Sequence, residues 1–178
     1  MLPDLIENKK KYLRWLSFLI LIAAVSVLQS TPNLLPRIWT AGAAPILVLC
    51  ICISMFEAEL PAAFLGLAGG VLWDCMAIRG EGYHSVFLFL CCFAASFLLR
   101  HYMRNNFLSA LVLCAAGTAL HHFFYWLFFF VLARVEGAGY LFVSNILPGT
   151  AYTLVFIPVF YFFVRFIARS LPDPDKGR

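Results

Sequence analysis

The amino-acid sequence predicts an all-α integral membrane protein, and its composition, its apolar runs and the placement of its basic residues each indicate this class. Of the 178 residues, 63% are hydrophobic and only 12% are charged, whereas a soluble domain is about one-quarter charged. The mean hydropathy of +0.89 indicates more apolar surface than a water-soluble fold of this size can bury. The length favours one transmembrane domain that comprises residues 1–178.

Six apolar stretches, separated by polar turns or by turns rich in glycine and proline, predict six transmembrane helices. A helix rises about 1.5 Å per residue, so about 20 residues cross a hydrocarbon core of about 30 Å. The fifth stretch is longer and is expected to tilt or protrude, and Pro158 predicts a kink in the sixth. The first stretch also fits a signal peptide, but its length and the lack of a small-residue cleavage site favour a retained helix. The predicted spans cover residues about 15–30, 38–56, 60–78, 83–100, 107–133 and 146–168.

The basic residues predict the orientation of these helices. Six spans place both termini on one side, and Lys and Arg accumulate on the cytoplasmic side of a membrane. Ten of the 13 basic residues fall on the side of the termini, which predicts that both termini are cytoplasmic. These ten are Lys9, Lys10, Lys11, Arg14, Arg100, Arg104, Arg165, Arg169, Lys176 and Arg178, and the other three are Arg37, Arg79 and Arg134. Because they lie at span ends and in the tails, we interpret them as topology determinants and expect no nucleic-acid partner.

The third span contains an apolar, glycine-rich run that ends in one carboxylate. Its small residues and that carboxylate recur every four positions and therefore share one helix face, which consists of Ala62, Gly66, Gly70 and Asp74. Small residues at this spacing let two helix backbones approach closely in a membrane. A carboxylate on that face is expected where helices meet, because exposure to lipid costs about 3 kcal/mol. The simpler alternative is that the glycines only pack and that Asp74 marks the polar end of the helix.

Few residues suggest catalysis. The ionisable candidates inside the spans are Asp74, His121 and His122, whereas a membrane enzyme needs several such groups at one depth. Adjacent histidines point about 100° apart on a helix, so His121 and His122 are poorly placed to share a metal. We expect them to form hydrogen bonds between helices, with a functional or proton-transfer contact as the alternative. The sequence therefore predicts a protein that is not an enzyme and has no cofactor and no metal.

Cysteines and aromatic residues are also concentrated in the spans. The six cysteines show no spacing typical of a metal site, and we interpret them as small apolar residues. The aromatic block at residues 123–130 usually indicates a surface facing lipid and the membrane interface. Its alternative role is to line a ligand pocket.

The segment from Gly66 to Leu90 resembles the signature region of the MreD family, the rod shape-determining membrane proteins of bacteria. The resemblance depends on a glycine-rich helix ending in aspartate, then a short turn, a Gly-x-His sequence and another apolar helix. In this chain the matching residues are Gly69-Gly70-Val71-Leu72-Trp73-Asp74 and Gly82-Tyr83-His84. The family's usual Gly-x-Pro-Leu-Gly turn is replaced by Arg79-Gly80-Glu81-Gly82, and elsewhere only length, span count and basic ends agree.

The resemblance implies a non-enzymatic scaffold or regulatory subunit of the cell-elongation machinery, with several spans in the bacterial inner membrane. The implied partners are MreC, by direct contact, and RodA, a class B penicillin-binding protein and MreB in the same complex, within the lipid bilayer. The face of Ala62, Gly66, Gly70 and Asp74 is then the helix-packing or partner interface. Gly82 and His84 form the outer turn, where Asp74 and His84 are placed to hydrogen-bond each other or a segment of a partner next to the membrane.

The MreD family is similar in architecture to the six-helix substrate-binding subunits of energy-coupling-factor vitamin transporters, and this similarity supplies the main alternative. It predicts a ligand pocket open to the outside, beneath the loops at residues 31–37 and 134–145. It also predicts small residues at every fourth position of the first span, but residues 23–28 contain no Ala-x-x-x-Ala. An enzyme that depends on Asp74 or His121 is the third and weakest alternative.

Overall fold

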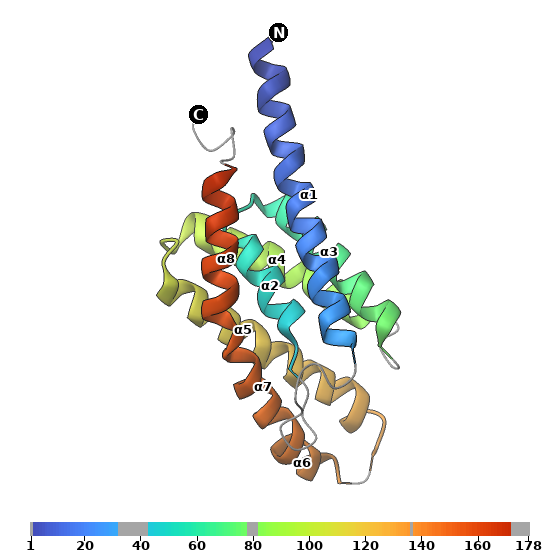
Figure 1. The fold of residues 1–178 in the computed structure, drawn as a ribbon. Coiled ribbons are helices and arrows are strands. Elements are labelled where there is room, and N and C mark those ends of the chain that lie inside the picture. Colours follow the sequence, from blue (N-terminus) through green and yellow to red (C-terminus); the bar gives the residue numbers. More distant parts are fainter. Residues whose placement is uncertain (1, 32–42, 78–81, 136, 172–178) are drawn as a thin grey trace.

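The computed structural model describes residues 2–31, 43–77, 82–135 and 137–171. Within these ranges the chain forms helices and no strands, which confirms the all-α class (Figure 1). Four helical segments are long and apolar enough to cross a membrane. These segments are Lys10–Ser30, Tyr83–His101, Phe107–Val131 and Gly139–Ser170. The six-span count and the orientation remain predictions.

The helix bounds agree with the predicted spans at most positions. The helices are α1 (Leu2–Ser30), α2 (Pro45–Ser54), α3 (Glu59–Met76), α4 (Tyr83–His101) and α5 (Phe107–Trp126), followed by the π-helix η1 (Leu127–Val131), α6 (Ala138–Leu141), the π-helix η2 (Phe142–Ile146), α7 (Leu147–Leu154) and α8 (Phe156–Ser170). Two differences extend the helices: the basic head lies within α1, and residues 138–145, expected in a loop, are helical. Lys, Leu and Glu in the head favour a helix even outside the apolar run.

The second predicted span differs most from expectation. Among the described residues it is helical only from Pro45 to Ser54, and ten residues extend about 15 Å, half of a hydrocarbon core. Every residue of α2 is buried, and the helix contacts α1, α3, α4, α5 and α8. A short apolar helix of this kind is typical of a buried core element. Residues 38–42 of that predicted span lie outside the described residues.

The third predicted span corresponds to α3, which does not belong to the four long apolar segments. Its 18 residues include a carboxylate near each end, Glu59 and Asp74. Helix α3 packs more extensively against α4 than any other pair of helices in the described structure. Its outward-facing apolar residues include Leu60, Phe64 and Val71, so the helix has one lipid-compatible face and one packed face.

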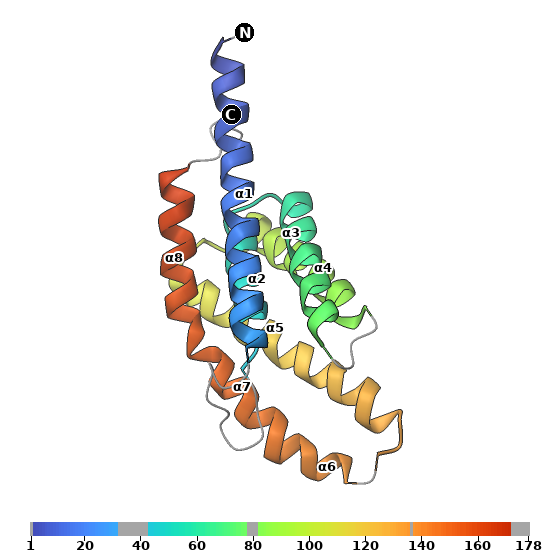
Figure 2. The same cartoon turned by 45° about the vertical axis from the view of Figure 1, so that its right-hand side comes forward.

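The predicted kink at Pro158 is confirmed. Proline has no N–H, so the carbonyl of Leu154 lacks its usual helical donor. Helix α7 ends at Leu154 and α8 begins at Phe156. Between them, the N–H of Val155 donates to the carbonyl of Tyr152 at 3.2 Å, three residues back and not the four of an α-helix. The chain changes direction between α7 and α8, and the end of α8 lies at the same end of the molecule as the start of α1 (Figures 1 and 2).

A buried ion pair stabilises this end of the bundle. The Nε atom of Arg14 donates to Oε1 of Glu57 at 2.5 Å, and the two side chains are 3% and 2% exposed. Arg14 also donates to the carbonyls of Phe56 at 2.6 Å and Leu171 at 3.2 Å. The guanidinium therefore joins α1 to the α2–α3 link and to the residue after α8. The sequence analysis interprets Arg14 as a topology determinant and does not predict this pairing with Glu57.

Candidate functional site

The small-residue face of α3 packs against α4 of the same chain. A Cβ atom added at Gly66 would lie 2.6 Å from the carbonyl oxygen of Leu88, and one added at Gly70 would lie 2.6 Å from that of His84. Ala62, on the same face, is 1% exposed. The predicted small-residue face therefore lies against a helix of the same chain. A partner could reach this face only by displacing α4.

Asp74 lies at the end of that face and caps the N-terminus of α4. Its Oδ1 accepts the backbone N–H of His84 at 3.2 Å, and its Oδ2 accepts the N–H of Ser85 at 2.9 Å and also the Ser85 hydroxyl. The first N–H groups of a helix have no partner within the helix, and a negative charge there is favourable. Asp74 therefore makes a polar contact with the residues after the outer turn, and this contact reaches the backbone of His84 and not its ring.

Gly82 makes this cap possible. It precedes α4 with φ of +85°, in the left-handed region where a Cβ atom is strained. The glycine turns the chain so that the N–H groups of residues 84 and 85 point at Asp74. The rest of the predicted turn, residues 79–81, lies outside the described residues.

The imidazole of His84 joins α4 to α3 and α5. Its Nδ1 lies 3.0 Å from Nε2 of His121, a distance at which one ring donates and the other accepts. The indole of Trp73 stacks on His84, with ring centroids 4.1 Å apart and an interplanar angle of 5°. The hydroxyl of Tyr83 donates to the carbonyl of His121 at 2.8 Å. Residues of the outer turn and of α5 therefore form one aromatic and hydrogen-bonded cluster.

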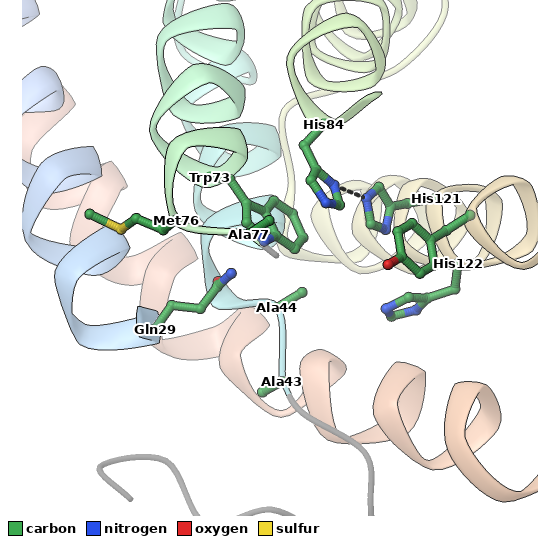
Figure 3. Close-up of a pocket in the computed structure, with 10 residues that line it drawn as sticks. Gln29, Ala43, Ala44, Trp73, Met76, Ala77, His84, His121 and His122 are labelled. Atoms are coloured by element: carbon green, nitrogen blue, oxygen red, sulfur yellow. Dashed lines mark hydrogen bonds between the residues drawn. The ribbon is translucent and has the colours of Figure 1, made fainter. Parts of the chain in front are cut away.

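This cluster forms one wall of a cavity of about 500 Å³ (Figure 3). The volume is within the range of small-molecule sites, about 300–1,000 Å³. The cavity lies at the end of α3 and the start of α4, away from the start of α1. Its lining residues are Gln29, Ala43, Ala44, Trp73, Met76, Ala77, His84, His121, His122 and Tyr125. None of these lining residues carries a carboxylate, an ammonium or a guanidinium group.

One polar atom of a residue in the cavity wall, Nδ1 of His121, lacks a hydrogen-bond partner among the described residues. His121 is 2% exposed, and its Nδ1 has no hydrogen-bond partner among the described residues. By contrast, Oε1 of Gln29 accepts the N–H of Ile46 at 3.2 Å, and Nδ1 of His122 lies 2.8 Å from Oγ1 of Thr150. Buried polar groups are nearly always hydrogen-bonded, so this nitrogen is an exception, and protein atoms enclose it on the side away from the cavity opening. The uncharged, largely aromatic lining of the cavity suits an uncharged ligand.

The two adjacent histidines act between helices, as expected. His121 pairs with His84 of α4 and His122 with Thr150 of α7, so the two side chains diverge from α5. Within the described ranges, no three His, Cys, Asp or Glu residues are grouped to hold a metal ion. The cysteines are mostly buried in the helix packing, and the Sγ atoms of Cys52 and Cys114 are 3.8 Å apart.

Among the polar and aromatic residues of the cavity, the sequence analysis gave no pocket role to Gln29 or Trp73. Gln29 is a polar residue at the end of an apolar span, a signal that could have pointed to it. Tyr125 belongs to the aromatic block, in which Phe123 and Phe128 are 44% and 50% exposed, as expected for lipid-facing rings. Phe123 and Phe128 therefore agree with the expected lipid-facing role of the block, whereas Tyr125 agrees with its alternative role of lining a pocket.

Comparisons of the chain with protein-family models, with curated proteins and with solved structures gave no match. Function is therefore inferred from the side chains and geometry described above.

Proposed function

We propose that this protein is a non-enzymatic membrane scaffold of the bacterial cell-elongation machinery, similar to MreD, which binds MreC directly and links it to peptidoglycan synthesis. The observation that carries this proposal is that Gly66, Gly70, Trp73 and Asp74 of α3 all contact α4 in its first half. The glycines bring α3 against α4, Asp74 caps α4, and Trp73 and His84 stack in the cavity wall. The polar groups of Asp74 and His84 hold neighbouring helices in place, and a scaffold needs this fixed arrangement.

The outer end of the molecule is the surface that we propose for the partner. The glycine face is covered by α4, and both carboxylate oxygens of Asp74 bind α4. The wall formed by Trp73, His84 and His121 remains open to the cavity, where a segment of MreC next to the membrane could bind. A rigid wall loses little conformational entropy when a partner binds. Binding of one partner there can therefore change the affinity for another, which is an energetic coupling between the two.

We also propose where the protein lies and which proteins accompany it. The chain crosses the bacterial inner membrane several times, with both termini in the cytoplasm. RodA, a class B penicillin-binding protein and MreB belong to the same complex. The shared position of the start of α1 and the end of α8 supports an even number of crossings (Figures 1 and 2). The basic residues concentrated on that side support its cytoplasmic assignment.

Co-purification tests the proposal. The tagged full-length protein is extracted from its own membranes in detergent, and the bound proteins are identified by mass spectrometry. We expect MreC to be recovered with the unmodified protein and with a Val86→Ala control, because Val86 is 61% exposed on α4. Recovery should fall with His84→Ala. The proposal is wrong if MreC is absent, or if a folded protein with Gly70→Leu and Asp74→Ala binds MreC normally and supports rod shape.

The cavity favours a second candidate, a substrate-binding subunit of an energy-coupling-factor vitamin transporter. Its volume of about 500 Å³, its stacked aromatic wall and its uncharged lining suit a small planar ligand. The same purified material, searched for small molecules, decides between the two functions. A stoichiometric vitamin together with a pair of ATPase subunits would replace the scaffold proposal. MreC without a bound small molecule would exclude the transporter subunit.

A further inference from the structure

The cavity beside Trp73 presents hydrogen-bond donors to a bound group. Its lining carries no charged side chain, so its polar character comes from uncharged nitrogens, three of which belong to Gln29, Trp73 and His84. The carboxamide of Gln29 uses its Oε1 to accept the N–H of Ile46, and no described residue accepts from its Nε2. In Figure 3 the side chain of Gln29 extends toward Trp73. The amide nitrogen of Gln29 is therefore the first available donor.

The indole N–H of Trp73 is the second donor. Trp73 is half-buried and stacks on His84, and no described residue accepts from its Nε1. Among the described residues, the polar side-chain atoms that are both enclosed and without a partner are Oγ1 of Thr118 and Nδ1 of His121. The nitrogens of Trp73 and Gln29 are thus accessible. An indole N–H and an amide NH₂ donate and never accept.

The third donor follows from the histidine pair. Because Nδ1 of His121 is enclosed without a partner, a proton on it would be a buried N–H without an acceptor. A buried N–H of this kind is rarer in proteins than an acceptor without a donor. The neutral His121 therefore carries its proton on Nε2 and donates it to Nδ1 of His84, 3.0 Å away. His84 then carries its own proton on Nε2, for which no described residue is an acceptor.

We propose that this cavity selects a neutral carbonyl group, such as an amide, whose oxygen accepts from these donors. A carbonyl oxygen has two lone pairs, and a planar amide matches the flat wall where Trp73 and His84 stack at an interplanar angle of 5°. An ammonium would meet the positive ends of the N–H groups. A carboxylate would find no cation in the lining, and the carboxylate of Asp74 already lies 3.2 Å from the backbone nitrogen of His84.

This inference deepens the proposed function and rests on it for the source of the amide, which is the segment of MreC next to the membrane. The group that enters the cavity is then a backbone carbonyl or the carboxamide of an Asn or Gln side chain. The selection itself depends only on the donors of this chain, so it is measurable on the purified protein without a partner.

Binding of small aromatic probes to the purified full chain in detergent, measured by saturation-transfer NMR, tests the selection. Benzamide, benzoate and benzylamine share one ring and differ in carrying a neutral carbonyl, a carboxylate or an ammonium. We expect benzamide to bind most tightly. Trp73→Phe keeps a ring on His84 but removes the N–H, and should weaken benzamide binding by about fivefold. Trp126→Phe is the matched control, because Trp126 does not line the cavity. Equal losses in the two variants, or tighter binding of benzoate or benzylamine, would overturn the proposal.

Nitrogen-15 NMR of the histidine-labelled protein tests the direction of the donors, since the chemical shift distinguishes a protonated ring nitrogen from an unprotonated one. We expect the proton on Nε2 in both His84 and His121. A proton on Nδ1 of His121 would contradict the proposal, because His84 would then present a lone pair to the cavity. Selective binding of benzamide without recovery of MreC would remove the scaffold function and retain the selection. Recovery of MreC without a preference for benzamide would do the reverse.

Discussion

Asp74 of α3 accepts the backbone N–H of Ser85 at 2.9 Å and so holds the N-terminus of α4 across the turn between the two helices. The carboxylate substitutes for the side-chain cap that α4 lacks in its own sequence, where Gly82 occupies the capping position. The outer ends of α3 and α4 are thereby held together, and His84 is oriented toward the cavity by the same contact.

Asp74→Ala should destabilise the protein by about 2 kcal/mol, because two N–H groups at the start of α4 lose their acceptor. Asp74→Asn keeps an oxygen acceptor and should cost clearly less. Reversible unfolding in detergent, followed by circular dichroism, measures both values. Equal stability of the alanine and asparagine variants would mean that the cap contributes nothing beyond space filling.

Gly70→Ala should destabilise the contact between α3 and α4 by about 1–3 kcal/mol. The new Cβ atom would lie 2.6 Å from the carbonyl oxygen of His84, and this atom belongs to the backbone, so the helices must separate. Gly139→Ala is the matched control, because its Cβ atom would meet nothing within 4 Å. The same unfolding measurement applies, and similar losses at the two positions would contradict close packing at Gly70.

Arg14→Met and Glu57→Leu should each destabilise the protein by about 3–5 kcal/mol, since each leaves one buried charge without its partner. The double variant should lose less than the sum of the two, because it removes both charges. A double-mutant cycle on the free energy of unfolding gives the coupling. Strictly additive losses would show that the 2.5 Å contact contributes no pairwise stabilisation.

His122→Phe and Thr150→Val should each cost about 1 kcal/mol through loss of the hydrogen bond between α5 and α7. In a double-mutant cycle, the second substitution should cost less once the first is present. Val143→Ala serves as the reference variant, because Val143 is 63% exposed and lies outside this contact. Independent effects at the two positions would argue that the side chains of His122 and Thr150 do not bond.

Much of the fold follows from local features of the sequence. Helix α4 begins at Tyr83, the residue at which the fourth span was predicted to begin, because Gly82 interrupts the apolar pattern just before it. The bend before Pro158 follows from one missing N–H group. The shortness of α2 could not be predicted in this way. Its apolar residues look the same whether they face lipid or other helices, and only the surrounding helices show that all ten are buried.

The sequence by itself determined that the chain forms apolar helices, that small residues and Asp74 share one face of α3, and that a turn ends at Gly82. Hydropathy and helical periodicity are properties of neighbouring residues, so they can be read along the chain. Only the tertiary structure decided what meets each face. The pairs His84 with His121 and Arg14 with Glu57 are 37 and 43 residues apart, and their contacts depend on how whole helices pack. Helical periodicity shows which residues share a face of a helix, whereas the packing of the helices decides which residues that face contacts.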